Sequence, residues 1–322
     1  MAEEKRTQAG RTEPSWGRVL ATTVQLWVSR WLGRPPRRRW RLIAVVVALA
    51  FGAGVTLGFT SMFSGSKGQV SARMAAHSTP SGDPAAMVRS QAAAWVAAQV
   101  GANVVIACFP DMCSALEARG VSAGRLMPLS SGGAAVPAAS VLVTSPSGSN
   151  PALDRSAPGL IASFGPAGTQ VEVRVVASAG AAAYQSALAS DLAARKVAGP
   201  QLLNNSHLRF TAADTAELKA GEVDSRLLLL LATLAPQHTL RVVSFGDAAP
   251  GAPLLYRQVT LASAGAGAAA ANLSGAMAIV QAQTSPYAPA HAATVSLPGG
   301  QSGLSIEFAT PGPLGLLAGA VP

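Results

Sequence analysis

Hydrophobic and polar residues between positions 85 and 200 follow two alternating periodicities. A helical pattern over 85–100, "AAMVRSQAAAWVAAQV", precedes the apolar run "NVVIACF", and a second helical pattern begins at Asp111 and ends at Gly120. Short apolar runs between helices are typical of buried strands, and their alternation with helices indicates a parallel sheet. Further strands are predicted at "GRLMPL", "SVLVTS", "GLIASFG" and "VEVRVVA". A long helix over 181–197 closes this part of the chain.

Residues 201–322 show a less regular order of elements. Helices are predicted over 212–220, 222–235 and 266–283, and strands at "TLRVVSF", "LLYRQVTL", "ATVSL" and "LSIEF". Because these helices and strands do not alternate strictly, the pattern favours α+β architecture here. The expected fold class is therefore α/β, with a Rossmann-like α/β domain over 85–200 followed by an α+β domain over 201–322.

The longest uncharged stretch, residues 42–63, precedes both of these regions. It has 22 residues, and a helix of that length extends about 33 Å, enough to cross the hydrocarbon core of a bilayer. A cleaved signal peptide has a shorter apolar run and a small-x-small cleavage site, whereas 41 residues precede this run and "TSMFSGSKG" follows it. We therefore predict an uncleaved signal anchor, a single transmembrane helix in the lipid bilayer.

The charges that flank this segment predict its orientation. Only Lys67 and Arg73 follow it closely, and five arginines lie just before it: Arg34, Arg37, Arg38, Arg39 and Arg41. Positive charge remains on the cytoplasmic side, so we expect residues 1–41 in the cytoplasm. The small polar residues of 64–84 indicate a flexible stalk, and the remainder is expected outside the cytoplasm as part of a bacterial cell envelope.

Two patterns in the N-terminal region indicate partners. Ala50, Gly54 and Gly58 form a small-xxx-small stripe, which predicts packing against a second copy or another membrane protein. Tryptophans and valines recur at helical spacing over 15–33, which predicts an amphipathic helix lying in the lipid headgroups. A helix that docks on a partner protein and an unstructured tail are the alternatives for this stretch.

The positive charge of the chain lies mainly in its N-terminal tail. The net charge is +9, of which residues 1–41 carry ten basic and three acidic side chains, or +7. Residues 64–322 carry fourteen basic and twelve acidic side chains, or +2. A large region close to neutrality gives no electrostatic reason to expect nucleic acid as a partner.

The chain has two cysteines, Cys108 and Cys113, five residues apart. Outside the cytoplasm a nearby pair of this kind is expected to form a disulfide. Free buried thiols are one alternative. A redox-active pair is the other, because Cys113 would lie in the first turn of a helix, where a thiolate is favoured.

Few residues indicate catalysis, and none indicates a metal or a cofactor. The four histidines are scattered, and the chain contains no H-E-x-x-H and no G-x-S-x-G. "GAGAAA" at 265–270 resembles a dinucleotide fingerprint, but the acidic residue that should follow it is missing. Asp111 and Asp247 each follow a predicted strand, where α/β sheets place their sites, and they are the candidate catalytic acids. Helix capping or turn formation is the alternative role for both.

Four segments carry a resemblance to a known group of proteins: 92–129, 173–199, 221–238 and 306–317. Together they resemble uncharacterised actinobacterial single-span membrane proteins with an extracytoplasmic α/β domain. The resemblance covers most of residues 85–322 and implies no particular activity or cofactor. Residues 223–235 are also similar to helices of cell-wall peptidase-like domains, although the zinc-binding His and Asp residues of those enzymes are missing here.

These observations favour a non-enzymatic envelope protein whose outer part binds another envelope component or assembles with a membrane partner. One alternative is an extracytoplasmic hydrolase that acts on cell-wall glycan or peptide through Asp111 and Asp247. Another alternative is a sensor of an extracellular small ligand that signals through the tail.

Overall fold

The computed structural model describes residues 83–130, 138–145, 151–247, 249–265 and 269–318. Residues 80–322 form one compact unit of mixed α/β architecture with two five-stranded sheets. The predicted tail, transmembrane helix and stalk, with Ala50, Gly54 and Gly58, lie outside the described residues. Within the described ranges, no helix is long and apolar enough to cross a membrane.

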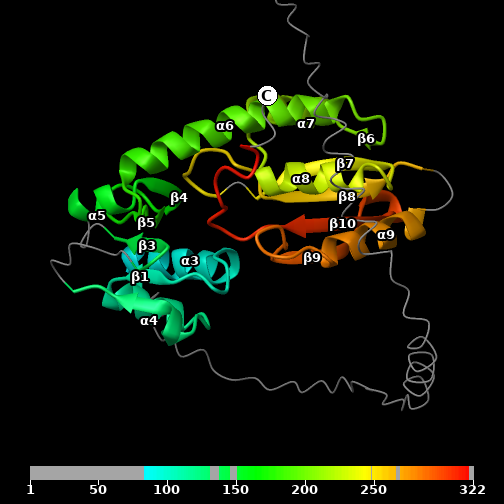
Figure 1. Ribbon diagram of the computed structural model, residues 1–322. Helices are drawn as coiled ribbons and strands as arrows, with labels where there is room; N and C mark the ends of the chain where they lie inside the picture. The colour runs from blue at the N-terminus through cyan, green and yellow to red at the C-terminus, as the bar shows by residue number, and fades with distance from the viewer. Residues whose placement is uncertain (1–82, 131–137, 146–150, 248, 266–268, 319–322) are drawn as a thin grey trace, which may run out of the picture. The chain divides into compact units, whose positions relative to one another are not determined.

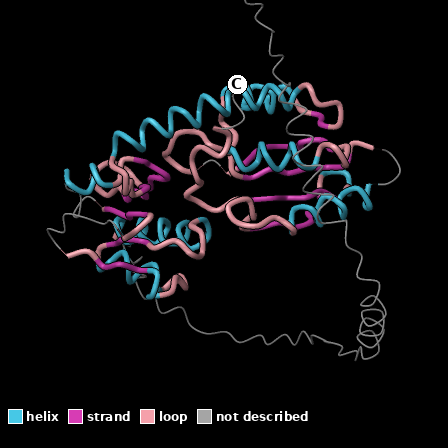
Figure 2. Tube along the Cα trace, in the orientation of Figure 1, coloured by secondary structure: helices cyan, strands magenta, loops and turns pink. Residues whose placement is uncertain are grey.

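The first sheet has the strand order β2-β1-β3-β5-β4 (Figures 1 and 2). Its strands are β1 (Ile106–Cys108), β2 (Leu126–Pro128), β3 (Val141–Thr144), β4 (Gly159–Phe164) and β5 (Val171–Val175). β1 pairs in parallel with β2 and β3, as the alternation of elements predicted, but β5 runs antiparallel to both β3 and β4. The reason is the short connection between β4 and β5, since a parallel pair requires a crossover of a dozen or more residues.

Helices cover both faces of the first sheet. They are α3 (Pro84–Gln99), α4 (Pro110–Glu117) and α5 (Pro151–Ser156). Along β1, Ile106 and Cys108 belong to one core with α3 and α4, whereas Ala107 packs with α5 on the opposite face. This follows from the two-residue period of a strand. The ring of Trp95 in α3 lies 5.8 Å from that of Phe164 in β4, and the guanidinium of Arg257, from the second half of the chain, lies over the Trp95 ring.

The helix α6 (Ala181–Leu203) connects the two sheets. Near its start, Tyr184 lies directly against Gly159 of β4, where no space remains for a larger residue. Further along, the helix packs against α7 (Ala212–Ala220) and α8 (Ser225–Leu234) of the second half. Because α6 contacts both halves, its buried side chains are available to a site between them.

The second sheet has the strand order β6-β7-β8-β10-β9. Its strands are β6 (Leu208–Arg209), β7 (Leu240–Gly246), β8 (Gln258–Ser263), β9 (His291–Ser296) and β10 (Ser302–Glu307). The helices α7, α8 and α9 (Ala269–Gln281) pack against this sheet and share one apolar core with it. The largest contribution from a single helix comes from the leucines of α8, of which five are buried: Leu227, Leu228, Leu230, Leu231 and Leu234.

Two segments of the second half return to the first sheet. Thr310 donates its backbone N–H to the carbonyl of Gln99 and accepts one from Gly101, so the chain after β10 lies beside the end of α3. The loop between β7 and β8 reaches the edge of β4, where Ser163 donates its backbone N–H to Pro250. The junction between the two sheets is therefore formed by α3, β4, α6, the β7–β8 loop and residues 308–315.

Candidate functional site

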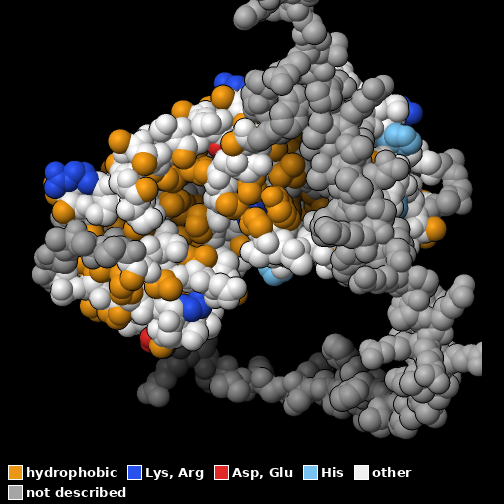
Figure 3. Space-filling view, viewed as in Figure 1, with side chains coloured by type: hydrophobic (Ala, Val, Ile, Leu, Met, Phe, Trp, Pro, Cys, Tyr) orange, Lys and Arg blue, Asp and Glu red, His pale blue; other side chains and the backbone are white. Residues whose placement is uncertain are grey.

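A cavity of about 390 Å³ lies at this junction, and it is called the junction cavity below. It is lined by 158–161 at the start of β4, by one face of α6 from Tyr184 to Arg195, by 252–255 and Arg257, and by 310–314. Hydrophobic side chains gather beneath α6, where the surface is hollowed (Figure 3). Leu160, Leu188 and Leu254 belong to these walls, and Leu254 is 53% exposed.

Three ion pairs between arginine and aspartate lie in the junction. Arg195 donates to Asp191 at 2.8 Å, and Arg226 donates to both oxygens of Asp224 at 2.9 and 2.7 Å. In both pairs each side chain is 6% exposed. The third pair joins the Nη2 of Arg257 to Asp247 at 2.6 Å. Buried charges of this kind are retained in a fold only when each has a partner.

The ion pairs also connect elements of both halves. Asp191 in α6 accepts hydrogen bonds from the hydroxyl of Ser225 in α8 and from the backbone N–H of Gly315. Arg226 donates to the carbonyl of Ala309 at 2.9 Å, and its guanidinium lies 4.9 Å from the ring centre of Phe308. These contacts fix the position of residues 308–315, of which 310–314 form one wall of the junction cavity.

Of the three arginines in these ion pairs, Arg257 has the fewest hydrogen-bond acceptors among the described residues. Its side chain is only 4% exposed and its guanidinium lies 5.6 Å from the ring centre of Trp95, yet its Nη1 has no hydrogen-bond acceptor among the described residues. Burial lowers the pKa of the Arg257 guanidinium, while the charges of Asp247, Asp224 and Glu307 act in the opposite direction. A buried N–H group without an acceptor is unfavourable, so an oxygen supplied by a ligand would stabilise it.

Asp247, one of the two candidate acids, lies in this junction. Its backbone is left-handed, with φ at 58°, in the turn that follows β7. Burial raises the pKa of the Asp247 carboxyl, the Arg257 guanidinium lowers it, and Glu307 raises it. Asp247 directly follows the end of β7, as the sequence predicted, and its ion-pair partner Arg257 lies ten residues later in the sequence.

Asp111, the other candidate acid, lies elsewhere. It is in the first turn of α4, where a carboxylate is favoured by the helix dipole, and its side chain is 81% exposed. Its hydrogen-bond partner is Arg89 at 3.3 Å. The two acids have different partners, and no hydrogen bond or ion pair joins them in the described part of the chain.

The two cysteines belong to the core that α3 and α4 form with the first sheet. A disulfide joins Cys108, at the end of β1, to Cys113 in the first turn of α4, with a Cα–Cα distance of 5.4 Å. Both residues are buried, at 0% and 6% exposed. The bond therefore fixes the turn between β1 and α4, and it lies within the buried core of the first half.

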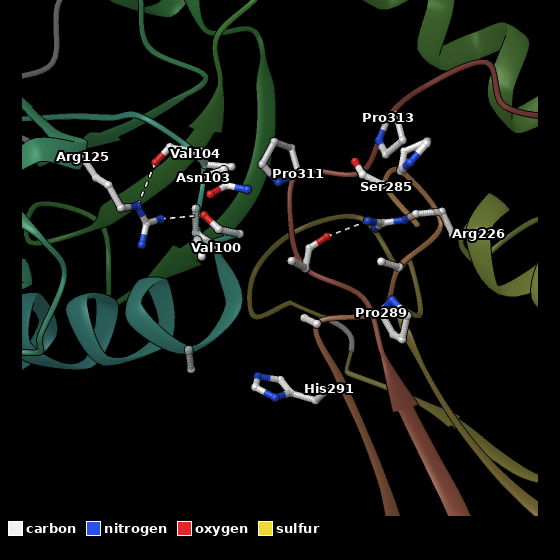
Figure 4. Close-up of a pocket in the computed structure, with 18 of the residues that line it drawn as sticks. Val100, Asn103, Val104, Arg125, Arg226, Ser285, Pro289, His291, Pro311 and Pro313 are labelled. Carbon is white, nitrogen blue, oxygen red and sulfur yellow. Dashed lines mark hydrogen bonds between the residues drawn. The ribbon is translucent and has the colours of Figure 1, made fainter. Parts of the chain in front are cut away.

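A second, larger cavity of about 750 Å³ shares Pro311, Gly312 and Pro313 with the junction cavity, and Figure 4 shows its lining. Its lining consists mainly of alanine and proline. Arg125 donates to the carbonyls of Val104 and Gly101, and Arg226 donates to Ala309 and Asp224. Since these arginines are engaged by the protein itself, the junction cavity offers the stronger recognition chemistry.

Sequence reasoning missed the arginines of the site. A weak signal was present for two of the three: Arg195 follows Asp191 by one helical turn, and Arg257 interrupts the apolar run "LLYRQVTL". Among the described residues, no group of three His, Cys, Asp or Glu side chains could hold a metal ion. The glycine-rich stretch at 265–270 lies partly outside the described residues. Comparison of the chain with protein-family models, with curated proteins and with solved structures finds no match.

Proposed function

We propose that the chain is a single-span envelope protein whose outer unit binds a small apolar ligand in the junction cavity and performs no reaction on it. The observation that carries this proposal is the cavity itself. Its volume of about 390 Å³ lies in the range of small-molecule sites, and it combines apolar walls with a few buried polar groups. Such sites bind through the walls and orient the ligand through the polar groups.

The positions of the acids favour binding over hydrolysis. Paired carboxylates that cleave a glycosidic bond must flank one point in space. Here Asp111 is an exposed residue of α4 beside Arg89, whereas Asp247 is held by Arg257 in the junction. The carboxylates closest to the cavity, Asp191 and Asp224, are both engaged in ion pairs.

The expected location supports the same proposal. The arginine-rich sequence before residues 42–63 favours an outer position for everything that follows. A disulfide between the two cysteines accords with an oxidising compartment. A reporter enzyme that is active only outside the cytoplasm, fused to the C-terminus, should therefore be active, and activity of a cytoplasmic reporter in its place would contradict the topology.

Photolabelling of the full-length chain tests the binding itself. A neutral eight-carbon probe with a diazirine group should label peptides that contain 158–161 and 252–255, and excess unlabelled octanamide should compete. Label confined to residues 42–63, or label that does not saturate, would contradict the proposal. Either result would mean that the probe partitions into the lipid bilayer and does not occupy a specific site.

Two variants make this experiment sharper. Leu254→Ser removes an apolar wall from the cavity, and because Leu254 is 53% exposed the fold should tolerate the change. Met87→Ser is the matched control, since Met87 is 61% exposed and does not line the cavity. Labelling should fall several-fold in the first variant and remain unchanged in the second. Equal labelling of both variants would place the ligand elsewhere.

A further inference from the structure

We infer that the group recognised in the junction cavity is a neutral carbonyl oxygen, as in an amide or an ester of a short acyl chain, and that Nη1 of Arg257 donates the hydrogen bond to it. This inference rests on the proposed function and adds the chemical class of the ligand. Arg257 lines the cavity, and Nη1 is its buried nitrogen without an acceptor among the described residues. Its Nη2 is already occupied by Asp247.

The choice of a carbonyl over an anion follows from the charges around Arg257. A guanidinium can donate to a carboxylate, a phosphate or a carbonyl, and by itself it favours the two anions, so a preference for the carbonyl has to come from its surroundings. The charges that act on Arg257 are those of Asp247, Asp224, Glu307 and Arg226. The three carboxylates carry three negative charges, and Arg226 and Arg257 together carry two positive charges. The remaining pair, Arg195 with Asp191, is neutral as a unit.

An anionic ligand would therefore enter a region that already carries an excess negative charge. Coulomb repulsion is strong where water is excluded, and the side chain of Arg257 is almost fully buried. A neutral carbonyl oxygen adds no charge and still satisfies Nη1. The apolar walls, which include Leu160 and Leu188, accommodate the alkyl part of such a ligand.

The matched probes for this inference are octanamide and octanoate. They have the same alkyl chain and carbonyl carbon, and at neutral pH they differ in an NH₂ group against a negative oxygen. In competition with the photoprobe on the full-length chain, octanamide should act at about tenfold lower concentration than octanoate, because both probes can accept the hydrogen bond from Nη1 but only octanoate adds a negative charge.

Substitution of Asp247 or Glu307 tests the charge argument without removing the donor. Asp247→Asn keeps a residue type that tolerates the left-handed backbone at φ 58° and removes one negative charge beside Arg257. Glu307→Gln removes another negative charge that acts on Arg257. In either variant the affinity for octanoate should rise several-fold while the affinity for octanamide changes little. The preference for octanamide over octanoate should therefore become smaller. A purely structural role of these acids would weaken both probes alike.

Removal of the donor completes the test. Arg257→Met retains an apolar stem of similar length, and in combination with Asp247→Asn it leaves no unpaired charge from this ion pair. The affinity for octanamide should then be about tenfold lower than in Asp247→Asn alone. An unchanged competition curve would overturn the role of Nη1.

The outcomes separate this inference from the proposed function. If both probes compete at the cavity but octanoate is equal or better in the unmodified chain, the inference is wrong and the binding function stands. If neither probe competes and no saturable label reaches the cavity, the proposed function itself fails.

Discussion

Arg226 is the residue whose removal should disturb the junction most. It donates to both oxygens of Asp224 and to the carbonyl of Ala309, and it stacks on Phe308. In Arg226→Met the carboxylate of Asp224 remains buried without its cation. Loss of one member of a buried pair costs about 3–5 kcal/mol, so we expect the free energy of unfolding to fall by about 4 kcal/mol.

This loss is measurable as a change in thermal stability. For a unit of this size, about 1 kcal/mol corresponds to about 2–4 °C, so the melting temperature should fall by about 8–16 °C. Arg155→Met, in the exposed part of α5, is the control and should change the free energy of unfolding by less than about 0.5 kcal/mol. Thermal unfolding of the full-length protein followed by near-UV circular dichroism gives both values.

A double variant separates the unpaired charge from the other lost contacts. Asp224→Asn preserves the side-chain oxygen that accepts the backbone N–H of Arg226 at the start of α8, and it removes the charge. Asp224→Asn with Arg226→Met should therefore be more stable than Arg226→Met alone. If the single variant loses less than about 1 kcal/mol, or if the double variant is the less stable of the two, the ion pair does not hold the junction in the way described.

Further predictions concern the disulfide and the titration of Asp247. Reduction of Cys108–Cys113, or replacement of both by Ser, should lower the free energy of unfolding by about 2 kcal/mol or slightly more, since the closed loop is short; an unchanged urea midpoint would show that packing alone fixes the turn. Burial raises the pKa of Asp247, so the folded state binds a proton more readily than the unfolded state. As the pH falls from neutral through this raised pKa, the unmodified protein should gain stability relative to Asp247→Asn, and a loss over the same range would refute the assigned direction.

The pattern of hydrophobic positions predicted most of the helices and strands between residues 83 and 318. The strongest patterns belong to β1, β7 and the leucine-rich α8. Each of these elements is buried on one or both sides, and burial selects apolar residues at those positions. β6 has only two residues, Leu208–Arg209, which is too short to form a pattern. The parallel sheet that the alternation predicted is found for β1, β2 and β3, whereas the antiparallel direction of β5 depends on the length of the turn before it, which the alternation does not indicate.

Of the residues in the junction, the sequence pointed only to Asp247, because it follows a predicted strand, and its role as a catalytic acid stays a prediction. Its relation to Arg257 and Trp95 depends on the contact between two sheets, which no local pattern encodes. The i, i+4 pair of Asp191 and Arg195 is typical of an exposed helix face, and only the packing of α6 against α8 buries it. The transmembrane helix and the packing stripe at Ala50, Gly54 and Gly58 stay predictions.

Hydrogen exchange of the full-length chain, with and without octanamide, tests the central claim that a ligand binds between the two sheets. If the ligand occupies the junction cavity, backbone amides in 158–164, 252–257 and 309–315 should all exchange more slowly when it is present, because these segments line or border one cavity. Slower exchange confined to a single one of these segments, or to residues 42–63, would contradict binding at the junction.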